Sequence, residues 1–251
     1  MGQIIAVVNQ KGGVGKTTTT VNLAASLTKA GEKVLLCDFD PQANATSGFG
    51  VTKRGRTTIY EAIIGGRAVS EAIVSTPYGD LIPASSALSG LGIELVTEEN
   101  RAYRLRDILA PLKEQYDYIF IDCPPSLELL TLNSLCAAES ILVPVQCEYY
   151  ALEGLSDLMA TLRTVKKSLQ PRLEIFGVLL TMYDGRVNLS LQVADEVRRH
   201  FPGKVFSTVI PRNVRLSEAP SHGKPVIAYD KYCRGAEAYN ALAQEILQKR
   251  L

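Results

Sequence analysis

Short apolar runs alternate with segments of helical periodicity along almost the whole chain. The apolar runs carry few polar residues on either face, which is typical of strands buried on both sides of a parallel sheet. We expect strands over residues 3–8, 33–37, 118–121, 141–145, 173–180 and 204–209. We expect helices over residues 16–30, 57–64, 100–115, 127–138, 152–169, 189–201 and 235–249. This alternation predicts an α/β fold with a mostly parallel, doubly wound sheet that helices cover on both faces.

The 251 residues show no internal repeat, low-complexity tract or linker, which favours a single domain over residues 1–251. We expect no helix-turn-helix extension before residue 1. No apolar run approaches the roughly 18 residues that a membrane span needs. In a sheet of this type, ligands bind beyond the carboxyl ends of the strands. The loops that follow the strands are therefore the place to look for a functional site.

The two parts of the chain differ in charge, although the whole carries a net charge of only +1. Residues 1–160 hold 12 Lys and Arg against 18 Asp and Glu, whereas residues 161–251 hold 15 against 8. The basic excess suggests an anionic partner for the C-terminal part, but basic solvated helix faces explain it equally well. The five cysteines form no C-x-x-C pair, which favours buried thiols in a reducing cytosol over a metal or iron–sulfur site.

Residues 9–20, NQKGGVGKTTTT, follow the first expected strand and open the first expected helix. Their end matches the phosphate-binding pattern G-x-x-x-x-G-K-S/T, but the leading glycine is replaced by Gln10, and a second lysine, Lys11, comes five residues before Lys16. Glycines let the backbone present N–H groups to phosphate oxygens beside the positive helix end. Lys16 would reach the β- and γ-phosphates, and Thr17 would bind Mg²⁺. The predicted nucleotide-binding residues here are Lys11, Gly12, Gly13, Val14, Gly15, Lys16, Thr17 and Thr18.

Three carboxylates end the expected strands on the same side as this loop. Asp38 and Asp40 close the run LLCDFD, two positions apart and so on one side of the strand, and Asp122 closes YIFID. With Thr17, Asp38 and Asp122 are the predicted Mg²⁺ ligands, directly or through water. Asp40 has two interpretations: it positions the attacking water, or it caps the turn that begins at Asp40-Pro41.

The motifs KGGVGKTTTTVNLA, DFDPQANATSGFG, DYIFIDCPPSL, LLTMYDGRVNLSLQV and VIPRNVRLSEAPSHGKPV run along the whole chain. Together they resemble the ParA/Soj family of chromosome- and plasmid-partition ATPases, part of the deviant-Walker P-loop group that includes MinD and the nitrogenase iron protein. The resemblance implies an ATPase that uses ATP and Mg²⁺ and forms a homodimer when ATP is bound. It assigns catalytic roles to Lys11, Lys16 and Asp40.

The resemblance also explains the second lysine. It implies that Lys11 reaches across the dimer to the nucleotide of the other subunit, and that Gly12 allows the partner to approach closely. This suits the charges, because two facing ATP molecules bring together about eight phosphate charges, if each carries about four, and need positive charge supplied in trans. The segment that matches the family's base-contact loop is Pro211, Arg212 and Asn213.

The resemblance further implies non-specific binding to double-stranded DNA, contacted by Arg186 and Arg215, and a ParB-like, DNA-bound protein that stimulates hydrolysis. The protein would be cytoplasmic and nucleoid-associated, and its role would be chromosome or plasmid segregation. Other basic residues are candidates to extend this surface, although for each of them alone a solvated helix face is the better explanation. They are Lys166, Lys167, Arg198, Arg199, Lys231, Lys249 and Arg250.

Three alternatives remain to be weighed. A MinD-like, membrane-associated ATPase needs an amphipathic tail, but the stripe of Tyr239, Leu242 and Ile246 is narrow and favours a final helix packed on the sheet, with no stable membrane association. An electron-transfer ATPase lacks the cysteine pair for a bridging cluster. A nucleotide-dependent scaffold without hydrolysis is disfavoured by Asp40.

Overall fold

The computed structural model describes residues 2–52, 55–126, 128–149 and 151–249. The strands are β1 Gln3–Val7, β2 Val34–Asp38, β3 Val74–Thr76, β4 Gly79–Ile82, β5 Tyr118–Asp122, β6 Ser140–Gln146 and β7 Glu174–Thr181. The α-helices are α1 Lys16–Lys29, α2 Asn44–Gly48, α3 Ile59–Ile64, α4 Leu91–Glu94, α5 Arg104–Leu109, α6 Leu129–Ala137, α7 Ala151–Ser168, α8 Asn188–His200, α9 Val214–Glu218, α10 Val226–Tyr229 and α11 Arg234–Lys249.

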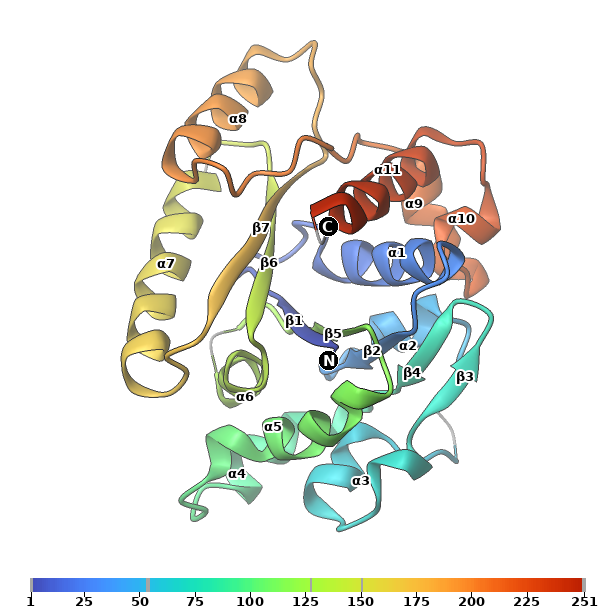
Figure 1. Cartoon of the computed structure of the whole chain (residues 1–251), viewed down its shortest axis with the longest axis vertical. Helices are drawn as coiled ribbons and strands as arrows, with labels where there is room; N and C mark the ends of the chain where they lie inside the picture. Colours follow the sequence, from blue (N-terminus) through green and yellow to red (C-terminus); the bar gives the residue numbers. More distant parts are fainter. Residues whose placement is uncertain (1, 53–54, 127, 150, 250–251) are drawn as a thin grey trace.

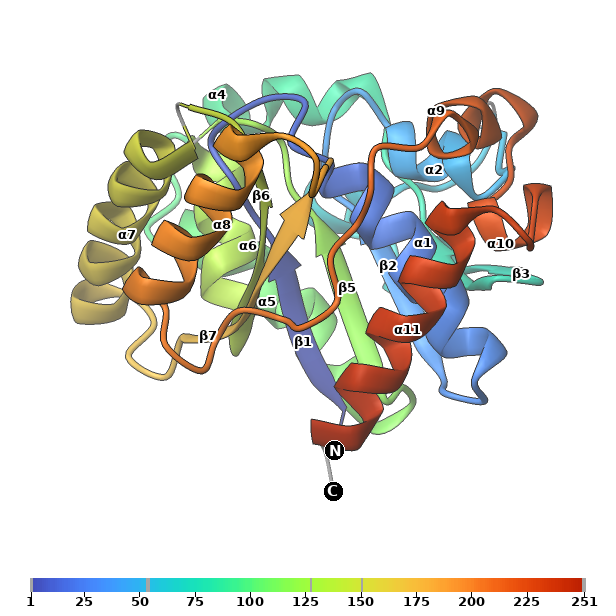
Figure 2. The same ribbon diagram turned by 90° about the horizontal axis from the view of Figure 1, so that it is seen from above.

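The strands form one sheet in the order β3-β4-β2-β5-β1-β6-β7. The ladders among β4, β2, β5, β1, β6 and β7 are parallel, and only β3 runs antiparallel to its neighbour β4. Helices lie on both sides of this sheet, as Figures 1 and 2 show. The predicted α/β fold, a mostly parallel sheet between two helical layers, is confirmed.

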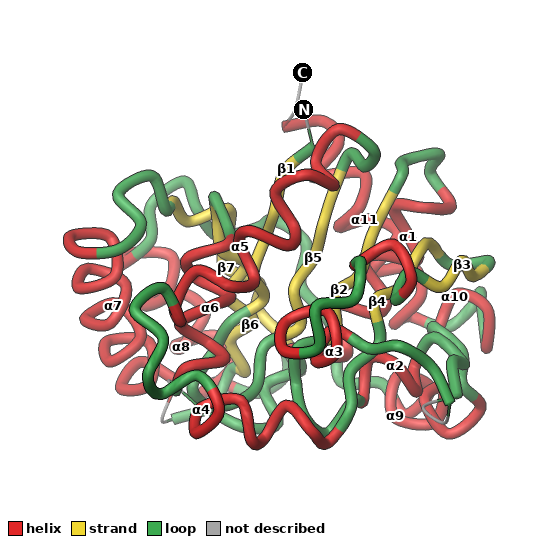
Figure 3. The backbone as a smooth tube through the Cα atoms, turned by 90° about the horizontal axis from the view of Figure 1, so that it is seen from below, coloured by secondary structure: helices red, strands yellow, loops and turns green. Residues whose placement is uncertain are grey.

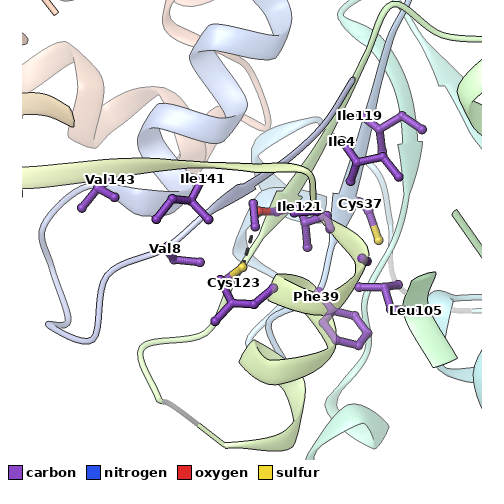
Figure 4. Packing of buried hydrophobic residues seen from close by; sticks show 14 of the residues in the cluster. Ile4, Val8, Cys37, Phe39, Leu105, Ile119, Ile121, Cys123, Ile141 and Val143 are labelled. Atoms are coloured by element: carbon purple, nitrogen blue, oxygen red, sulfur yellow. Dashed lines mark hydrogen bonds between the residues drawn. The ribbon is translucent and has the colours of Figure 1, made fainter. Parts of the chain in front are cut away.

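Each face of the sheet has its own apolar core. One cluster joins alternate residues of the strands, such as Ile4 and Ile121, to helices α3, α5, α6, α7 and α8. Figure 4 shows part of it, including the buried thiols of Cys37 and Cys123, and all five cysteines of the chain are free. The other cluster joins the opposite side of the strands, such as Ile5 and Phe120, to helices α1 and α11.

Helix α11 packs its apolar stripe inside the protein. Tyr239, Leu242 and Ile246 are buried in the same cluster as Leu23 and Leu27 of α1. The hydroxyl group of Tyr239 also lies 3.2 Å from that of Thr19. The prediction of a final helix packed on the domain is therefore confirmed, and in the described part of the chain no helix is both long and apolar enough to cross a membrane.

The sequence prediction missed one edge of the sheet. Strands β3 and β4 form a short hairpin, and β4 pairs in parallel with β2. The signal was present, since Pro77 and Gly79 flank the turn and Gly79 has a φ of 115°, which only glycine adopts readily. The strands themselves are three and four residues long, too short for a clear periodic pattern.

The predicted strand over residues 204–209 is wrong. This segment begins to pair with β7, with a single bridge between Val205 and Val178. The next two backbone N–H groups, of Ser207 and Thr208, instead donate to the Glu245 carboxylate at 2.8 and 2.9 Å. A side chain of α11 therefore takes the Thr208 N–H group, with which the ladder to β7 would continue after Phe206.

The predicted helix over residues 100–115 is interrupted. It consists of the 3-10 turn Arg101–Tyr103, then α5, then a second 3-10 turn, Ala110–Glu114, that contains Pro111. Proline lacks the N–H group that an α-helix interior uses, which explains the change after Leu109. The tube view of Figure 3 shows these pieces lying under the sheet beside α6. The predicted start of the next helix, Leu127, lies outside the described residues, and α6 is described from Leu129.

Candidate functional site

The loop between β1 and α1 has the backbone of a phosphate-binding loop. Gly13 and Gly15 have φ values of 77° and 92°, a left-handed conformation that glycine adopts without strain. Gly15 caps α1 without a side-chain hydrogen bond, so the helix N-terminus opens toward the loop. The Thr181 hydroxyl of β7 donates to the Val14 carbonyl at 2.8 Å and anchors the loop from the other side.

Lys16 lies on the floor of this loop, and only 7% of it is exposed. Its Nζ donates to the Lys11 carbonyl at 3.0 Å, which closes the loop across its own mouth. Burial lowers the pKa of Lys16, while the negative charge of Asp122 opposes that shift. A buried ammonium group is costly unless an anion pairs with it, so the placement of Lys16 suits the predicted phosphate contact.

The ends of β2 and β5 bring the carboxylates to the edge of the sheet where β1 leads into the loop. Asp122 is the register partner of both Val7 in β1 and Asp38 in β2. Its carboxylate accepts hydrogen bonds from Thr17 at 2.7 Å and from Thr20 at 3.0 Å, both on α1. Burial and the nearby Asp38 raise the pKa of Asp122 to about 8. The structure thus brings Thr17 and Asp122 together as the sequence predicted.

Asp38 is fully buried, and both of its oxygens have protein partners. One accepts from the backbone N–H and the hydroxyl of Thr46, each at 2.7 Å, and the other from the Asp40 N–H at 3.3 Å. Burial raises the pKa of Asp38 to about 6. The hydrogen bonds to Thr46 were missed by sequence reasoning, because nothing in the pattern places α2 against the end of β2.

Asp40 has the turn contact that one of its two interpretations required. Its carboxylate accepts from the Gln42 N–H at 2.9 Å, and its backbone carbonyl accepts from Ala43. Only 7% of Asp40 is exposed, and it is close enough to Lys16 to oppose the fall of that lysine's pKa. The turn fixes Asp40 beside the phosphate loop, which is also what a residue positioning a water molecule would need.

The donor set at this edge fits Mg²⁺. The groups beside the loop are hydroxyl and carboxyl oxygens, which Mg²⁺ prefers, and the buried carboxyl groups of Asp122 and Asp38 would bind such a cation in their deprotonated form. In the described ranges no group of three or more His, Cys, Asp or Glu is arranged to hold a metal ion by itself. Mg²⁺ commonly binds to one or two carboxylates and completes its shell with water and phosphate oxygens, so this small set is sufficient.

Lys11 lies at the lip of the loop and has a partner on its own chain. Its ammonium forms an ion pair with Glu148, which follows β6, and each side chain is 35% exposed. The Lys11 backbone N–H donates to the Asn9 side chain at 3.0 Å, and Asn9 in turn donates to the Pro144 carbonyl at 2.8 Å. Sequence reasoning missed Glu148, although its position just after a predicted parallel strand was an available signal.

A cavity of about 310 Å³ lies beside the loop. Its lining includes all three residues of the predicted base-contact segment, Pro211, Arg212 and Asn213. Gly15, Thr18 and Met182 also line it. The Tyr183 N–H donates to the Ile210 carbonyl at 3.0 Å, which holds this segment against the end of β7. Met182, which the sequence did not single out, has a φ of 50°, so the chain turns sharply there.

The two predicted DNA-contact arginines lie on different elements. Arg186 is on the turn before α8 and Arg215 on α9, and Figures 1 and 2 show these helices well apart. The Arg186 side chain is 90% exposed and forms two hydrogen bonds to Asp184. Arg215 is half-exposed and contacts Glu218 and Asp230. Most of the other basic residues also have acidic neighbours, and Arg250 lies outside the described residues.

Comparison with known proteins identifies the family. A family model described as an AAA domain matches residues 2–175. The chromosome partitioning protein ParA of Myxococcus xanthus is 54% identical over 99% of this chain and 89% of that protein. The sporulation initiation inhibitor protein Soj of Bacillus subtilis is 56% identical over 98% of both chains.

A solved structure is also similar along the full chain. The cobyrinic acid a,c-diamide synthase of Mycobacterium smegmatis, with an ATP analogue and magnesium bound, has a TM-score of 0.89 at 35% identity and covers 100% of this chain and 96% of that one. The chain is more similar in sequence to the partition proteins, at 54% and 56% identity, than to this synthase. The chain belongs to the ParA/Soj family of chromosome-partitioning ATPases.

Proposed function

We propose that this ATPase partitions DNA through a cycle in which Mg-ATP drives a sandwich dimer, the dimer binds DNA without sequence preference, and a ParB-like protein stimulates the hydrolysis that releases it. The observation that carries the proposal is the cluster formed at the phosphate loop by the buried Lys16 and Asp122 with the half-buried Thr17. The full-length likeness to chromosome-partitioning proteins supports the assignment of the cellular role.

The chain's own residues divide the work at the nucleotide. Lys16 and the loop N–H groups bind phosphate oxygens, and Thr17 with Asp122 and Asp38 holds the Mg²⁺. Bound Mg²⁺ would supply positive charge that offsets the negative charge of the phosphates. Asp40, fixed by its turn to Gln42, orients the attacking water. The segment Pro211–Asn213 beside the 310 Å³ cavity receives the base.

Dimerisation on ATP uses the lip of the loop. Lys11 supplies positive charge to the nucleotide of the partner subunit, which requires it to leave Glu148 on its own chain. A Cβ added to Gly12 would meet no atom within 4 Å, so the glycine is not needed for packing within this chain. Its small size therefore serves the approach of a second copy.

DNA binding follows from the dimer. Arg186 and Arg215 contact phosphates, and pairing two subunits doubles the number of such contacts on one duplex. ATP thereby controls DNA affinity, even if each subunit keeps its surface unchanged. The basic excess of residues 161–251 suits this partner. Membrane binding by the final helix is disfavoured because its apolar stripe packs on α1.

The test is binding to a random-sequence duplex with ATP, with ADP and without nucleotide, over a salt series, with anionic vesicles in parallel. We expect binding only with ATP, weakening steeply with salt because each phosphate contact releases a counterion. Arg186→Ala and Arg215→Ala should weaken DNA binding and leave ATP-driven dimerisation intact. Vesicle binding without DNA binding would contradict the proposal and favour a MinD-like, membrane-associated role.

A further inference from the structure

Arg186 is engaged by a carboxylate only two residues away. Its Nε lies 2.9 Å from one oxygen of Asp184 and its Nη2 2.8 Å from the other. The arginine thus donates to both oxygens of one carboxylate, the geometry with which arginine also binds phosphate. The pair is exposed, since the Arg186 side chain is 90% and the Asp184 side chain 33% accessible.

Arg215 also contacts acidic side chains of its own chain, but through two different carboxylates. Its Nη1 lies 2.7 Å from Glu218, and its Nε lies 3.4 Å from Asp230. The Tyr229 hydroxyl contacts Glu218 at 3.3 Å and helps to hold that carboxylate in place. Each of the two arginines that we propose to contact DNA therefore has an anion of its own chain on its guanidinium.

We propose that Asp184, with Glu218 in the same role at Arg215, competes with DNA phosphate for the arginine and so limits the DNA affinity of each subunit. This inference rests on the proposed DNA-binding function. Asp184 occupies the Nε–Nη2 edge of Arg186, one of the two edges through which a guanidinium can bind a phosphate with two hydrogen bonds, and its negative charge offsets that of the arginine locally. A single subunit then binds DNA weakly, and the doubled contacts of the dimer are needed to overcome the competition.

Asp184 also organises the turn, and this role can be separated from its charge. Its carboxylate accepts from the Arg186 backbone N–H at 3.1 Å, and its own N–H donates to the Ser190 hydroxyl at 3.2 Å. Asparagine can accept the same backbone hydrogen bond through its amide oxygen, because both residues form this kind of turn. Asp184→Asn therefore keeps the turn and removes the competing charge.

The alternative is that Asp184 holds the Arg186 side chain in the conformation that binds DNA. Loss of the Asp184 charge would then weaken DNA binding. The exposure of the pair argues against this, because an exposed ion pair orders its side chains only weakly. A full unit of negative charge beside the phosphate backbone, in contrast, repels the DNA over about 10 Å at 0.1 M salt.

The experiment measures DNA affinity of the full chain with ATP and with ADP, for wild type and Asp184→Asn, over a salt series. An exposed ion pair contributes a factor of about two to five, so we expect a gain of that size per subunit. The slope of log affinity against log salt should steepen by up to about 0.9 per subunit if the freed arginine neutralises one more phosphate. The gain should also appear with ADP, where wild type binds least.

Two controls isolate the mechanism. Asp195→Asn removes the same charge from an exposed pair with Arg198 elsewhere on α8, where the two atoms lie 3.3 Å apart. In an Arg186→Ala background, Asp184→Asn should lose most of its effect, because the arginine that it frees is gone.

Each outcome decides the matter. A gain that exceeds that of Asp195→Asn and needs Arg186 supports the inference. Unchanged or weaker binding, or a gain equal to that of Asp195→Asn, overturns it while leaving the proposed function intact. Wild type that fails to bind DNA with ATP overturns the proposed DNA function and this inference with it.

Discussion

The hydroxyl of Thr17 donates a 2.7 Å hydrogen bond to the carboxylate of Asp122, which lies 105 positions further along the chain. The first residue belongs to the first turn of α1 and the second to the last position of β5. Because β5 lies between β1 and β2, its end faces the start of the helix that β1 feeds. The bond therefore joins the two halves of the predicted Mg²⁺ site.

The burial of Asp122 predicts a pH-dependent stability. A carboxyl whose pKa is raised to about 8 binds its proton more tightly in the folded than in the unfolded state, so its contribution to stability is lost as pH rises from about 4 to 8. Asp122→Asn should remove this loss in the nucleotide-free protein. Each pKa unit is worth about 1.4 kcal/mol, and about 1 kcal/mol shifts Tm by roughly 2–4 °C in a chain of this size. Melting curves of wild type and Asp122→Asn at pH 4 and pH 8 test this prediction. A difference in Tm between the two proteins that does not grow with pH would contradict it.

Lys16→Ala should weaken nucleotide binding by roughly 10- to 100-fold, because hydrogen bonds to charged groups are worth about 1.5–3 kcal/mol. The measurement is a titration with a fluorescent ATP analogue and Mg²⁺. Lys29→Ala is the matched control, since Lys29 is exposed at the other end of the same helix. Normal ATP binding by Lys16→Ala would show that the loop has been assigned wrongly.

Asp40→Ala should bind ATP but hydrolyse it about 10²–10⁴-fold more slowly, the usual contribution of a group that prepares the nucleophile. The variant should then accumulate as an ATP-bound dimer on DNA. Phosphate release and size-exclusion chromatography measure the two properties. Asp157→Ala, an exposed change on α7, serves as the control. A monomeric variant with full turnover would exclude the assigned role.

Gly12→Val should fold normally and fail to dimerise with ATP. A Cβ at position 12 meets no atom within 4 Å in the monomer, so we expect the effect of the valine to come from a second subunit. Light scattering with ATP measures dimerisation, and a melting curve checks the fold. Gly92→Val makes the same exchange at another open position and should dimerise. Dimerisation of Gly12→Val at wild-type concentrations would refute a close approach at this loop.

Glu148→Gln should favour the ATP-bound dimer. Lys11 must leave Glu148 before it can reach the other subunit. Removing the charge of Glu148 weakens this ion pair and should therefore favour the dimer by a factor of about two to five for each lysine. The midpoint concentration for ATP-dependent dimerisation should fall accordingly. In a Lys11→Ala background, the same substitution should have no such effect. A higher midpoint for Glu148→Gln would mean that the carboxylate assists the trans contact.

Local sequence patterns predicted many elements of this structure. The run before Lys11 and the glycines after it specify a strand, a loop and a helix, because each depends on neighbours within a few residues. The pairing of Thr17 with Asp122 was also foreseeable, since strand ends of a parallel sheet meet at one edge. The hairpin of β3 and β4 had only a turn signal, at Pro77 and Gly79, because strands this short show no clear period.

What the sequence determined by itself was therefore the α/β alternation, the phosphate loop and the acidic strand ends, all written in contiguous or regularly spaced residues. The tertiary structure alone decided which distant side chains meet. Glu245 reaches across from α11 to take the donors of Ser207 and Thr208, and so ends a strand that the local pattern favoured. Glu148 meets Lys11 only because loops from separate strands converge at one edge of the sheet, and Thr46 meets Asp38 because the chain after β2 folds back onto the end of that strand. Such contacts depend on the packing of whole elements, which no short stretch of sequence encodes.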